Sequence, residues 1–304
     1  MTSQLAIARP FSFEHSLQFI RRFPPCADEV IVEPDRVTAA ISIDGRAYTF
    51  TVRGAGDAVV VDVDDRAVAA TLVRRAGAFL GIADDLGPFY AAAAGDPAMA
   101  EAVRALYGLH QVRFLGLEEI AVYCVMMQRT PLAQAARLKR RFLDRFGHPV
   151  TIGERTLRAM PSVDELAMLE VAAIAEAIGH RAKAERIAAV VRGVAALGGS
   201  FLRTAPYAVA KDALLALPGI GPFSATAILL RGLGRVDELP ALEMFERDGR
   251  RVYGAAWDPE LIARRYGDQI GYWSFYLKTW AARRRWSGDG SLARTLGGRR
   301  RATL

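Results

Sequence analysis

The sequence predicts an α+β protein in which a domain built on an antiparallel sheet is followed by an all-helical domain. Several β-rich segments with alternating apolar residues precede Asp64, and from about Leu109 onward the apolar periodicity is almost wholly helical. A chain of 304 residues is long enough for two domains that each bury a core. We therefore expect domains at 1–108 and 109–282 and a basic, flexible tail at 283–304.

The expected sheet rests on four segments and one turn. Asp44-Gly45 is a strong hairpin signal between two of the segments. Tyr48, Phe50 and Val52 alternate onto one face, which suits a sheet with one buried side. We expect helices from 67–79 and 88–107 to cover that side. The predicted strands are Val30–Glu33, Val37–Ile43, Arg46–Arg53 and Ala58–Val63.

The helical part carries start and stop signals at several places. Thr130-Pro131 can begin a helix, because proline is tolerated at the first helical position. Ser162 and Glu165 have the spacing of a capping box, and Gly179 can end the helix that follows. A further helix is expected at 181–196. No internal repeat interrupts this pattern, so an all-helical second domain is predicted.

The overall composition is that of a soluble globular protein. Hydrophobic residues make up 52% and charged residues 24% of the chain. No apolar run reaches the roughly 18 to 20 residues that a membrane-spanning helix needs. The first ten residues lack the apolar core of a signal peptide. We therefore expect a cytoplasmic protein that does not contact membranes.

Two cysteines and a positive net charge narrow the choice of cofactors and partners. Cys26 and Cys124 are too few for a disulfide framework or a four-thiolate iron–sulfur cluster, so we expect no metal and no cofactor. The formal net charge of +7 suits a polyanionic partner, although many proteins with no such partner are equally basic.

The most informative segment is Leu217-Pro218-Gly219-Ile220-Gly221, followed by Pro222-Phe223-Ser224-Ala225. It lies between two helical patterns, and its two glycines permit a sharp turn with close backbone approach. The second helix would present unpaired N–H groups and its positive dipole end at the turn. Such a hairpin can hold a DNA phosphate without reading sequence. The alternative is a corner between two helices whose glycines serve packing alone.

Residues 217–225 resemble the hairpin of the helix-hairpin-helix DNA glycosylases, and nearly the whole chain is similar to the DNA-3-methyladenine glycosylase II branch of that superfamily. Weaker matches lie at 119–147, at 177–187 and at 273–277, and the sheet-containing N-terminal third fits this branch. The resemblance implies a helix-hairpin-helix glycosylase domain at 109–282. It also implies a monomeric base-excision repair enzyme, associated with the nucleoid, that excises alkylated purines of the 3-methyladenine type from damaged double-stranded DNA.

Phe223 stands where the bifunctional members of the superfamily carry a lysine that attacks the sugar and forms a Schiff base. An aromatic residue there is what the resemblance implies for a monofunctional enzyme, in which water is the nucleophile and the backbone is not cut. Phe223 is alternatively a core residue at the start of the second hairpin helix. In both readings the lyase nucleophile is missing.

The resemblance also points to a base pocket. A base must leave the stack before it can be excised, and a cationic alkylated purine gains roughly 0.5 to 2 kcal/mol over an aromatic face. Phe223, Tyr272 and Trp273 are the aromatic candidates, and Gln128 is a candidate hydrogen-bonding residue near the pocket. The alternatives are core positions for the aromatic residues and a helix cap for Gln128.

The sequence departs from the family at the catalytic carboxylate. The essential aspartate of the family stabilises the cationic sugar that develops as the base leaves, and counting on from Phe223 brings one to Glu243. Asp237 and Glu238 are the alternatives if the register is shifted, and Glu243 is otherwise an exposed residue at a helix start. A second hypothesis follows from this departure, namely a DNA-damage-binding protein of the same fold without catalysis.

Overall fold

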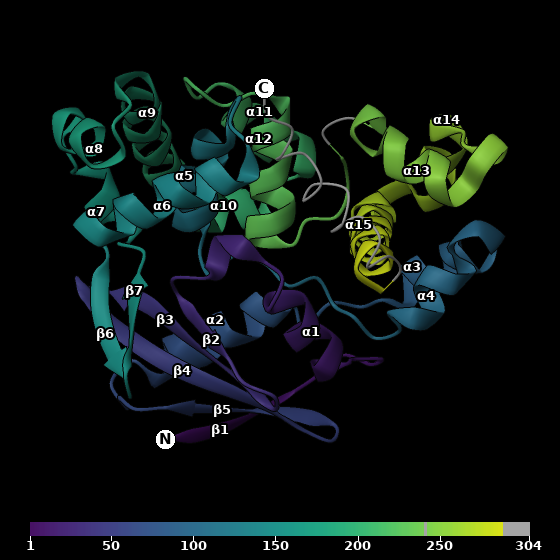
Figure 1. The fold of residues 1–304 in the computed structure, drawn as a ribbon, viewed down its shortest axis with the longest axis horizontal. Coiled ribbons are helices and arrows are strands. Elements are labelled where there is room, and N and C mark those ends of the chain that lie inside the picture. The colour runs from purple at the N-terminus through teal and green to yellow at the C-terminus, as the bar shows by residue number, and fades with distance from the viewer. Residues whose placement is uncertain (240–241, 288–304) are drawn as a thin grey trace, which may run out of the picture.

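The structure is a computed structural model and describes residues 1–239 and 242–287. A five-stranded antiparallel sheet in the order β1-β5-β4-β3-β2 lies beneath the helices (Figure 1). The four predicted strands are confirmed. The edge strand β1 was not predicted, because its five residues are at best partly buried and bear no apolar stripe. The strands are β1 (Thr2–Ala6), β2 (Val30–Val32), β3 (Arg36–Ile43), β4 (Arg46–Ala55) and β5 (Ala58–Val63).

The β3–β4 hairpin turns at the predicted place. Asp44 and Gly45 have φ angles of 49° and 76°, as expected when two residues with positive φ connect two strands. Phe50 and Val52 are fully buried, and Tyr48 packs against the same cluster. The predicted alternation of buried side chains is therefore confirmed.

Only one of the two helical regions expected over the sheet covers it. The helix α2 (Ala69–Leu80) packs on the sheet through Leu72 and Phe79. The short helices α3 (Gly87–Ala94) and α4 (Ala100–Ala105) pack instead with the C-terminal helices. Phe89 accounts for the difference, because its ring centroid lies 4.6 Å from that of Tyr276, near the far end of the chain.

The expectation of an all-helical second part is corrected by a small hairpin, β6 (His148–Ile152) and β7 (Arg155–Ala159). Leu157 and Ala159 pack on the face of the main sheet opposite α2, and each strand is only five residues long. Strands this short bury too few side chains to produce a clear alternation in the sequence.

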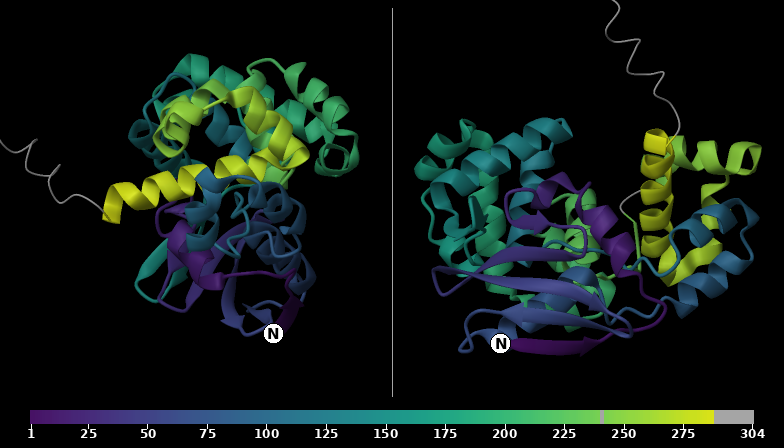
Figure 2. Two further views of the ribbon diagram at one scale, coloured as in Figure 1. Left: turned by 90° about the vertical axis from the view of Figure 1, so that its right-hand side faces the viewer. Right: turned by 60° about the horizontal axis from the view of Figure 1, so that its bottom comes forward.

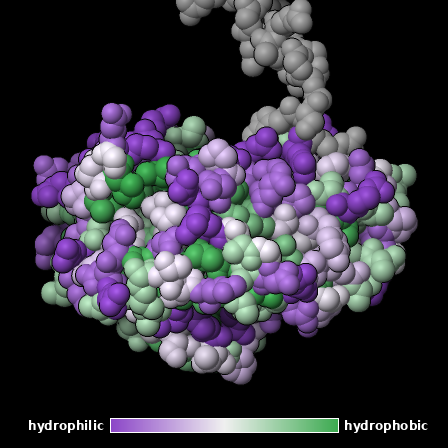
Figure 3. Space-filling view, turned by 90° about the horizontal axis from the view of Figure 1, so that it is seen from below, coloured by the Kyte–Doolittle hydropathy of each residue, from purple (hydrophilic) through white to green (hydrophobic). Residues whose placement is uncertain are grey.

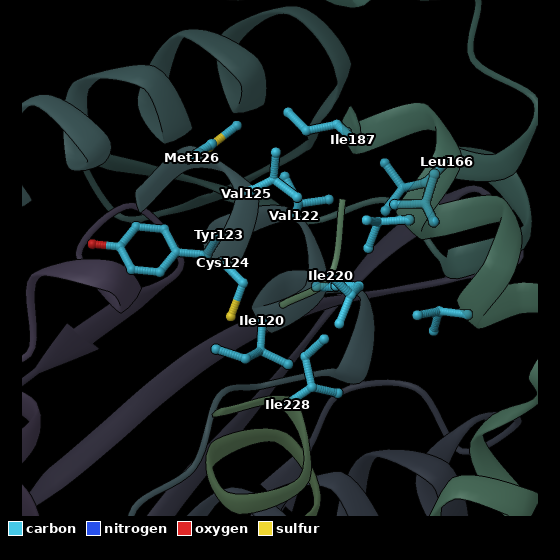
Figure 4. Close-up of a cluster of buried hydrophobic side chains, with 14 of the residues drawn as sticks. Ile120, Val122, Tyr123, Cys124, Val125, Met126, Leu166, Ile187, Ile220 and Ile228 are labelled. Carbon is cyan, nitrogen blue, oxygen red and sulfur yellow. The ribbon is translucent and has the colours of Figure 1, made fainter. Parts of the chain in front are cut away.

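The helical body surrounds α5 (Leu117–Met127), which is buried from Ile120 to Met126 (Figure 4). The predicted capping box of Ser162 and Glu165 begins α7, and Gly179 ends α8 with a φ of 69°. The helices around α5 are α6 (Leu132–Phe146), α7 (Val163–Ala167), α8 (Val171–Ile178), α9 (Arg181–Leu197), α10 (Gly199–Thr204), α11 (Tyr207–Leu215) and α12 (Pro222–Ala227).

The C-terminal helices form a group of their own beside the sheet (Figure 2). They are α13 (Glu246–Tyr253), α14 (Pro259–Tyr266) and α15 (Ile270–Ser287), and they share a core with α3 and α4. The residues 288–304 of the expected tail lie outside the described part of the chain, whereas 283–287 form the end of α15.

In the described ranges, no helix combines the length and the apolar character that crossing a membrane requires. The face shown in Figure 3 is largely hydrophilic, with hydrophobic side chains gathered in small separate areas.

A buried charge cluster joins the N-terminal part to the helical body. The ammonium group of Lys139 on α6 contacts the carboxylates of Glu29 and Glu119 and donates to the carbonyl oxygen of Pro25 in the helical turn η1 (Pro24–Cys26). Burial would lower the pKa of Lys139, but the two carboxylates raise it. Burial, together with the neighbouring Glu119, raises the pKa of the Glu29 carboxyl well above its usual range.

We expect Lys139→Met to destabilise the fold by about 3–5 kcal/mol, because it leaves two carboxyl groups buried without their cation. Urea unfolding followed by circular dichroism measures the change. Arg140→Met is the matched control, since Arg140 pairs with Asp28 at the surface and we expect a loss of less than about 1 kcal/mol. Equal losses in the two variants would contradict a special contribution of the buried cluster.

Candidate active site and hairpin

The segment between α11 and α12 is a tight hairpin. The N–H of Ile220 donates to the carbonyl oxygen of Leu217 at 3.1 Å. Ile220 is 8% exposed and packs in the core of the helical body, where Leu217 also makes contact. These apolar side chains anchor the turn from within.

The two hairpin glycines serve different purposes. Gly219 has a φ of +93°, and a Cβ atom there would lie 3.3 Å from the Cβ of Arg186. Gly221 has a φ of −106°, which any residue adopts, and a Cβ atom there would meet nothing within 4 Å. Gly219 is therefore required by the turn itself. A side chain at Gly221 would therefore not obstruct the turn, and its open side faces free space.

Gln128 braces the hairpin from the end of α5. Its side-chain Nε2 donates to the carbonyl oxygen of Gly219 at 2.8 Å, and its own carbonyl oxygen accepts from the ammonium group of Lys183 at 2.7 Å. Gln128 lines an open groove of about 830 Å³ together with the hairpin, Arg129 and Arg186. The residue expected near the base pocket therefore lies in this groove, and it does not line the cavity that adjoins it.

The cavity has a volume of about 420 Å³, within the usual range for small-molecule sites. It shares Phe223 and Met244 with the groove, so the two adjoin at these residues. Phe223 is 37% exposed at this junction. The other walls come from distant parts of the chain: Phe19 of α1 (Phe13–Ile20) and Phe275 of α15 both line the cavity.

Tyr272 and Trp273 were expected in the pocket, but they lie in the core. Trp273 is fully buried, and its indole N–H donates to the hydroxyl of Tyr253 at 2.8 Å. The hydroxyl of Tyr272 donates to Asp84 at 2.6 Å. The next two residues of α15, Ser274 and Phe275, line the cavity in their place.

Arg231 is the most unusual group in the cavity wall. It belongs to a π-helical turn, η3 (Ile228–Gly232), a distortion often found at functional sites. Its guanidinium carbon lies 4.9 Å from the ring centroid of Phe23 and 5.5 Å from that of Phe275. Burial lowers the pKa of Arg231 to about 10, so it stays charged at neutral pH.

The cavity wall is basic. Arg22, Arg231, Lys278 and Arg283 line it, and no acidic side chain does so among the residues that the structure describes. Lys278 donates to the carboxylate of Asp248 at 2.8 Å, which offsets one of these charges. A further carboxylate at the cavity would lie in a strongly favourable potential.

Glu243 has its backbone in the helical turn η4 (Leu242–Phe245), directly before two residues that line the cavity. Met244 and Phe245, the next two residues, both line it. The Glu243 side chain lies outside the described part of the structure. Of the two alternative acids, Glu238 pairs with Lys211, and neither it nor Asp237 lines the cavity.

Sequence reasoning missed most of the cavity wall. The α1 side chains gave no signal, because only the fold brings the N-terminal residues beside α15. Gln111 gave none either, since it follows His110 in a short stretch without helical or strand periodicity. Phe245 was missed as well, although the sequence carried a signal for it, because it is an aromatic residue two positions beyond the predicted Glu243.

No protein-family model matches the chain. It is 30% identical over 152 residues to the DNA-3-methyladenine glycosylase of Bacillus subtilis, which covers 49% of this chain and 50% of that protein. It is 27% identical over 210 residues to a probable bifunctional transcriptional activator/DNA repair enzyme AlkA of Mycobacterium tuberculosis, covering 65% of this chain and 42% of that protein. The chain thus spans about half the length, or less, of these curated relatives.

Solved structures show the same fold over most of the chain. A 3-methyladenine DNA-glycosylase from Archaeoglobus fulgidus has a TM-score of 0.75 and 21% identity, with 94% of this chain and 98% of that one covered. An 8-oxoguanine glycosylase/lyase of Clostridium acetobutylicum in complex with double-stranded DNA has a TM-score of 0.63 and 14% identity, with 85% and 99% covered. The expected resemblance and the α+β fold are confirmed.

Proposed function

We propose, from the fold that this chain shares with the helix-hairpin-helix DNA glycosylases and from its relatives named DNA-3-methyladenine glycosylase, that it is a monofunctional DNA glycosylase for alkylated purines in base-excision repair. The observation that carries the proposal is that the groove and the cavity adjoin at Phe223 and Met244, which line both. A duplex held against the hairpin would have an extruded base directly beside the cavity.

Each step of the proposed reaction has a candidate group. The hairpin amides near Gly221 hold a phosphate, and the target base leaves the stack and enters the cavity. Phe223 stacks on the base, because the rings of Phe19 and Phe275 already face Arg231. Water attacks the sugar, and the carboxylate of Glu243 stabilises the positive charge that develops there.

The alternative is a DNA-damage-binding protein of the same fold that does not catalyse. The observation that favours it is a glutamate at the position where the resemblance implies an aspartate. Incubation of the purified protein with methylated genomic DNA, followed by mass spectrometry of released bases, separates the two. Release of 3-methyladenine supports the enzyme, and tight binding of methylated DNA without release supports the alternative.

Gly221→Val should weaken binding to duplex DNA of any sequence and leave thermal stability nearly unchanged. The open space beside Gly221 means that a side chain there obstructs only an approaching phosphate. Fluorescence anisotropy at several salt concentrations measures this, and the affinity of the wild type should fall steeply with salt. Gly219→Val is the comparison, since its positive φ also makes the variant less stable. If Gly221→Val binds duplex DNA as tightly as the wild type, the hairpin is not part of the DNA-binding site.

The protein should release a base and leave the abasic strand intact, because Phe223 stands where a lyase carries lysine. Borohydride added during the reaction should therefore trap no covalent protein–DNA adduct. A lyase of the same superfamily, treated in parallel, provides the positive control. A trapped adduct would mean that another amine of this chain attacks the sugar.

Glu243→Gln should slow base release by about tenfold or more, whereas Glu243→Asp should keep or raise the rate. A negative charge about 4 Å from a sugar cation is worth roughly 4 kcal/mol at an effective dielectric near 20, or about a thousandfold in rate. Glutamate has one more rotatable bond than aspartate and is held less firmly, so we expect activity mainly on 3- and 7-methylpurines, whose bases depart neutral, and little on hypoxanthine.

Single-turnover release of 3-methyladenine, 7-methylguanine and hypoxanthine measures these rates, with the affinity for undamaged duplex as the control. If Glu243→Gln is as active as the wild type, the carboxylate role belongs to another acid, with Asp237 and Glu238 the next to test.

A further inference from the structure

Gln111 lines the cavity from a position that its neighbours hold in place. It lies in a largely buried segment without helix or strand between α4 and α5, and it is fully buried itself. The ring nitrogens of His110 lie 2.7 and 2.8 Å from the backbone carbonyl oxygens of Gly81 and Pro10. The carbonyl oxygen of Val112 accepts from Arg231 at 2.9 Å. The residues on either side of Gln111 are thus fixed by hydrogen bonds.

The side-chain amide of Gln111 is the exception in this segment. Neither its Oε1 nor its Nε2 has a hydrogen-bond partner among the residues that the structure describes. Buried polar groups without partners cost free energy and are uncommon, so each one calls for an explanation. Gln111 also lines the cavity, whereas the hydroxyl of Ser274 beside it already donates to the carbonyl oxygen of Gly271 at 2.8 Å.

We propose that the amide of Gln111 binds the extruded base by its N6–N7 edge and so selects adenine lesions. This rests on the proposed glycosylase function. An amide offers one acceptor and one donor side by side, and adenine presents the complementary pair, an N6 amino donor and an N7 acceptor. A methyl group on N3 leaves this edge intact. A 7-methylguanine has lost the N7 acceptor, and its neighbouring oxygen is not a donor.

The side chains around Gln111 favour recognition of the base by an uncharged group at this position. Arg231 and Lys278 in the cavity wall supply only donors, so neither can accept a hydrogen bond from an amino group. Gln111 belongs to the same wall, and its Oε1 is an acceptor without a partner among the residues that the structure describes. An adenine amino group therefore finds at Gln111 the acceptor that the basic side chains lack.

The test uses Gln111→Met, which keeps the side-chain length and removes both hydrogen-bonding atoms. Duplex DNA treated with dimethyl sulfate provides both methylated purines in one reaction. We expect the wild type to favour 3-methyladenine over 7-methylguanine in kcat/KM. The variant should lose about tenfold of that preference, which is the lower end of what a bidentate amide–adenine contact discriminates.

Two controls separate this role from a structural one. The melting temperature of Gln111→Met should not fall, because the variant no longer buries an unpartnered amide. Its affinity for a duplex containing a tetrahydrofuran site should match the wild type, since that ligand has no base. Gln4→Met, the same change at an exposed position of strand β1, should alter neither the melting temperature nor this affinity.

An unchanged preference in Gln111→Met would overturn the proposal, as would a wild type that favours 7-methylguanine. An equal loss for both purines together with a lower melting temperature would assign Gln111 a structural role. A wild type that releases no base from methylated DNA contradicts the proposed function itself, and the assignment of Gln111 fails with it.

Discussion

The cavity depends on the buried ammonium group of Lys139, because this group holds the N-terminal segment against the helical body. Lys139 contacts Glu29, Glu119 and the carbonyl oxygen of Pro25. Pro25 follows α1 closely in the chain, so the contact also fixes the helix whose Phe19 lines the cavity. Burial and the neighbouring Glu119 raise the pKa of the Glu29 carboxyl, which favours its uncharged form beside the second acid. The cavity wall, which distant segments of the chain form, thus depends on the few polar contacts of Lys139.

The electrostatics of the cavity constrain the chemistry that fits it. A basic wall opposes the entry of a cationic methylated base, and the rings nearest to Arg231 already face its guanidinium group. A carboxylate on η4 would offset both the wall and the charge that forms on the sugar. The positive charge of the wall is therefore a physical reason for the role proposed for Glu243, and this reason is independent of the spacing of Glu243 from the hairpin.

The sequence was informative where a local rule determines the structure. Asp44-Gly45 set the main hairpin, and Ser162 with Glu165 began a helix as their spacing predicted. The sequence failed where burial comes from distant segments. The helix α15 is buried on nearly all sides between Ile270 and Leu277, so its periodicity does not separate core from cavity. Trp273 was therefore expected in the pocket although its neighbour Phe275 lies there.

The segment that follows the hairpin helix is tightly held at Arg235 and Val236. Arg235 donates to the carbonyl oxygens of Leu202 and Ala205 at 3.2 and 2.7 Å. The carbonyl oxygen of Val236 accepts from the N–H of Gly271 at 2.9 Å, and a Cβ atom on Gly271 would lie only 2.7 Å from the Val236 Cα. These contacts hold the chain that follows the hairpin helix against the end of α10 and the start of α15. A phosphate bound at the hairpin, as proposed, would therefore have a fixed position relative to α15, whose Phe275 lines the cavity. Such preorganisation is what electrostatic stabilisation requires.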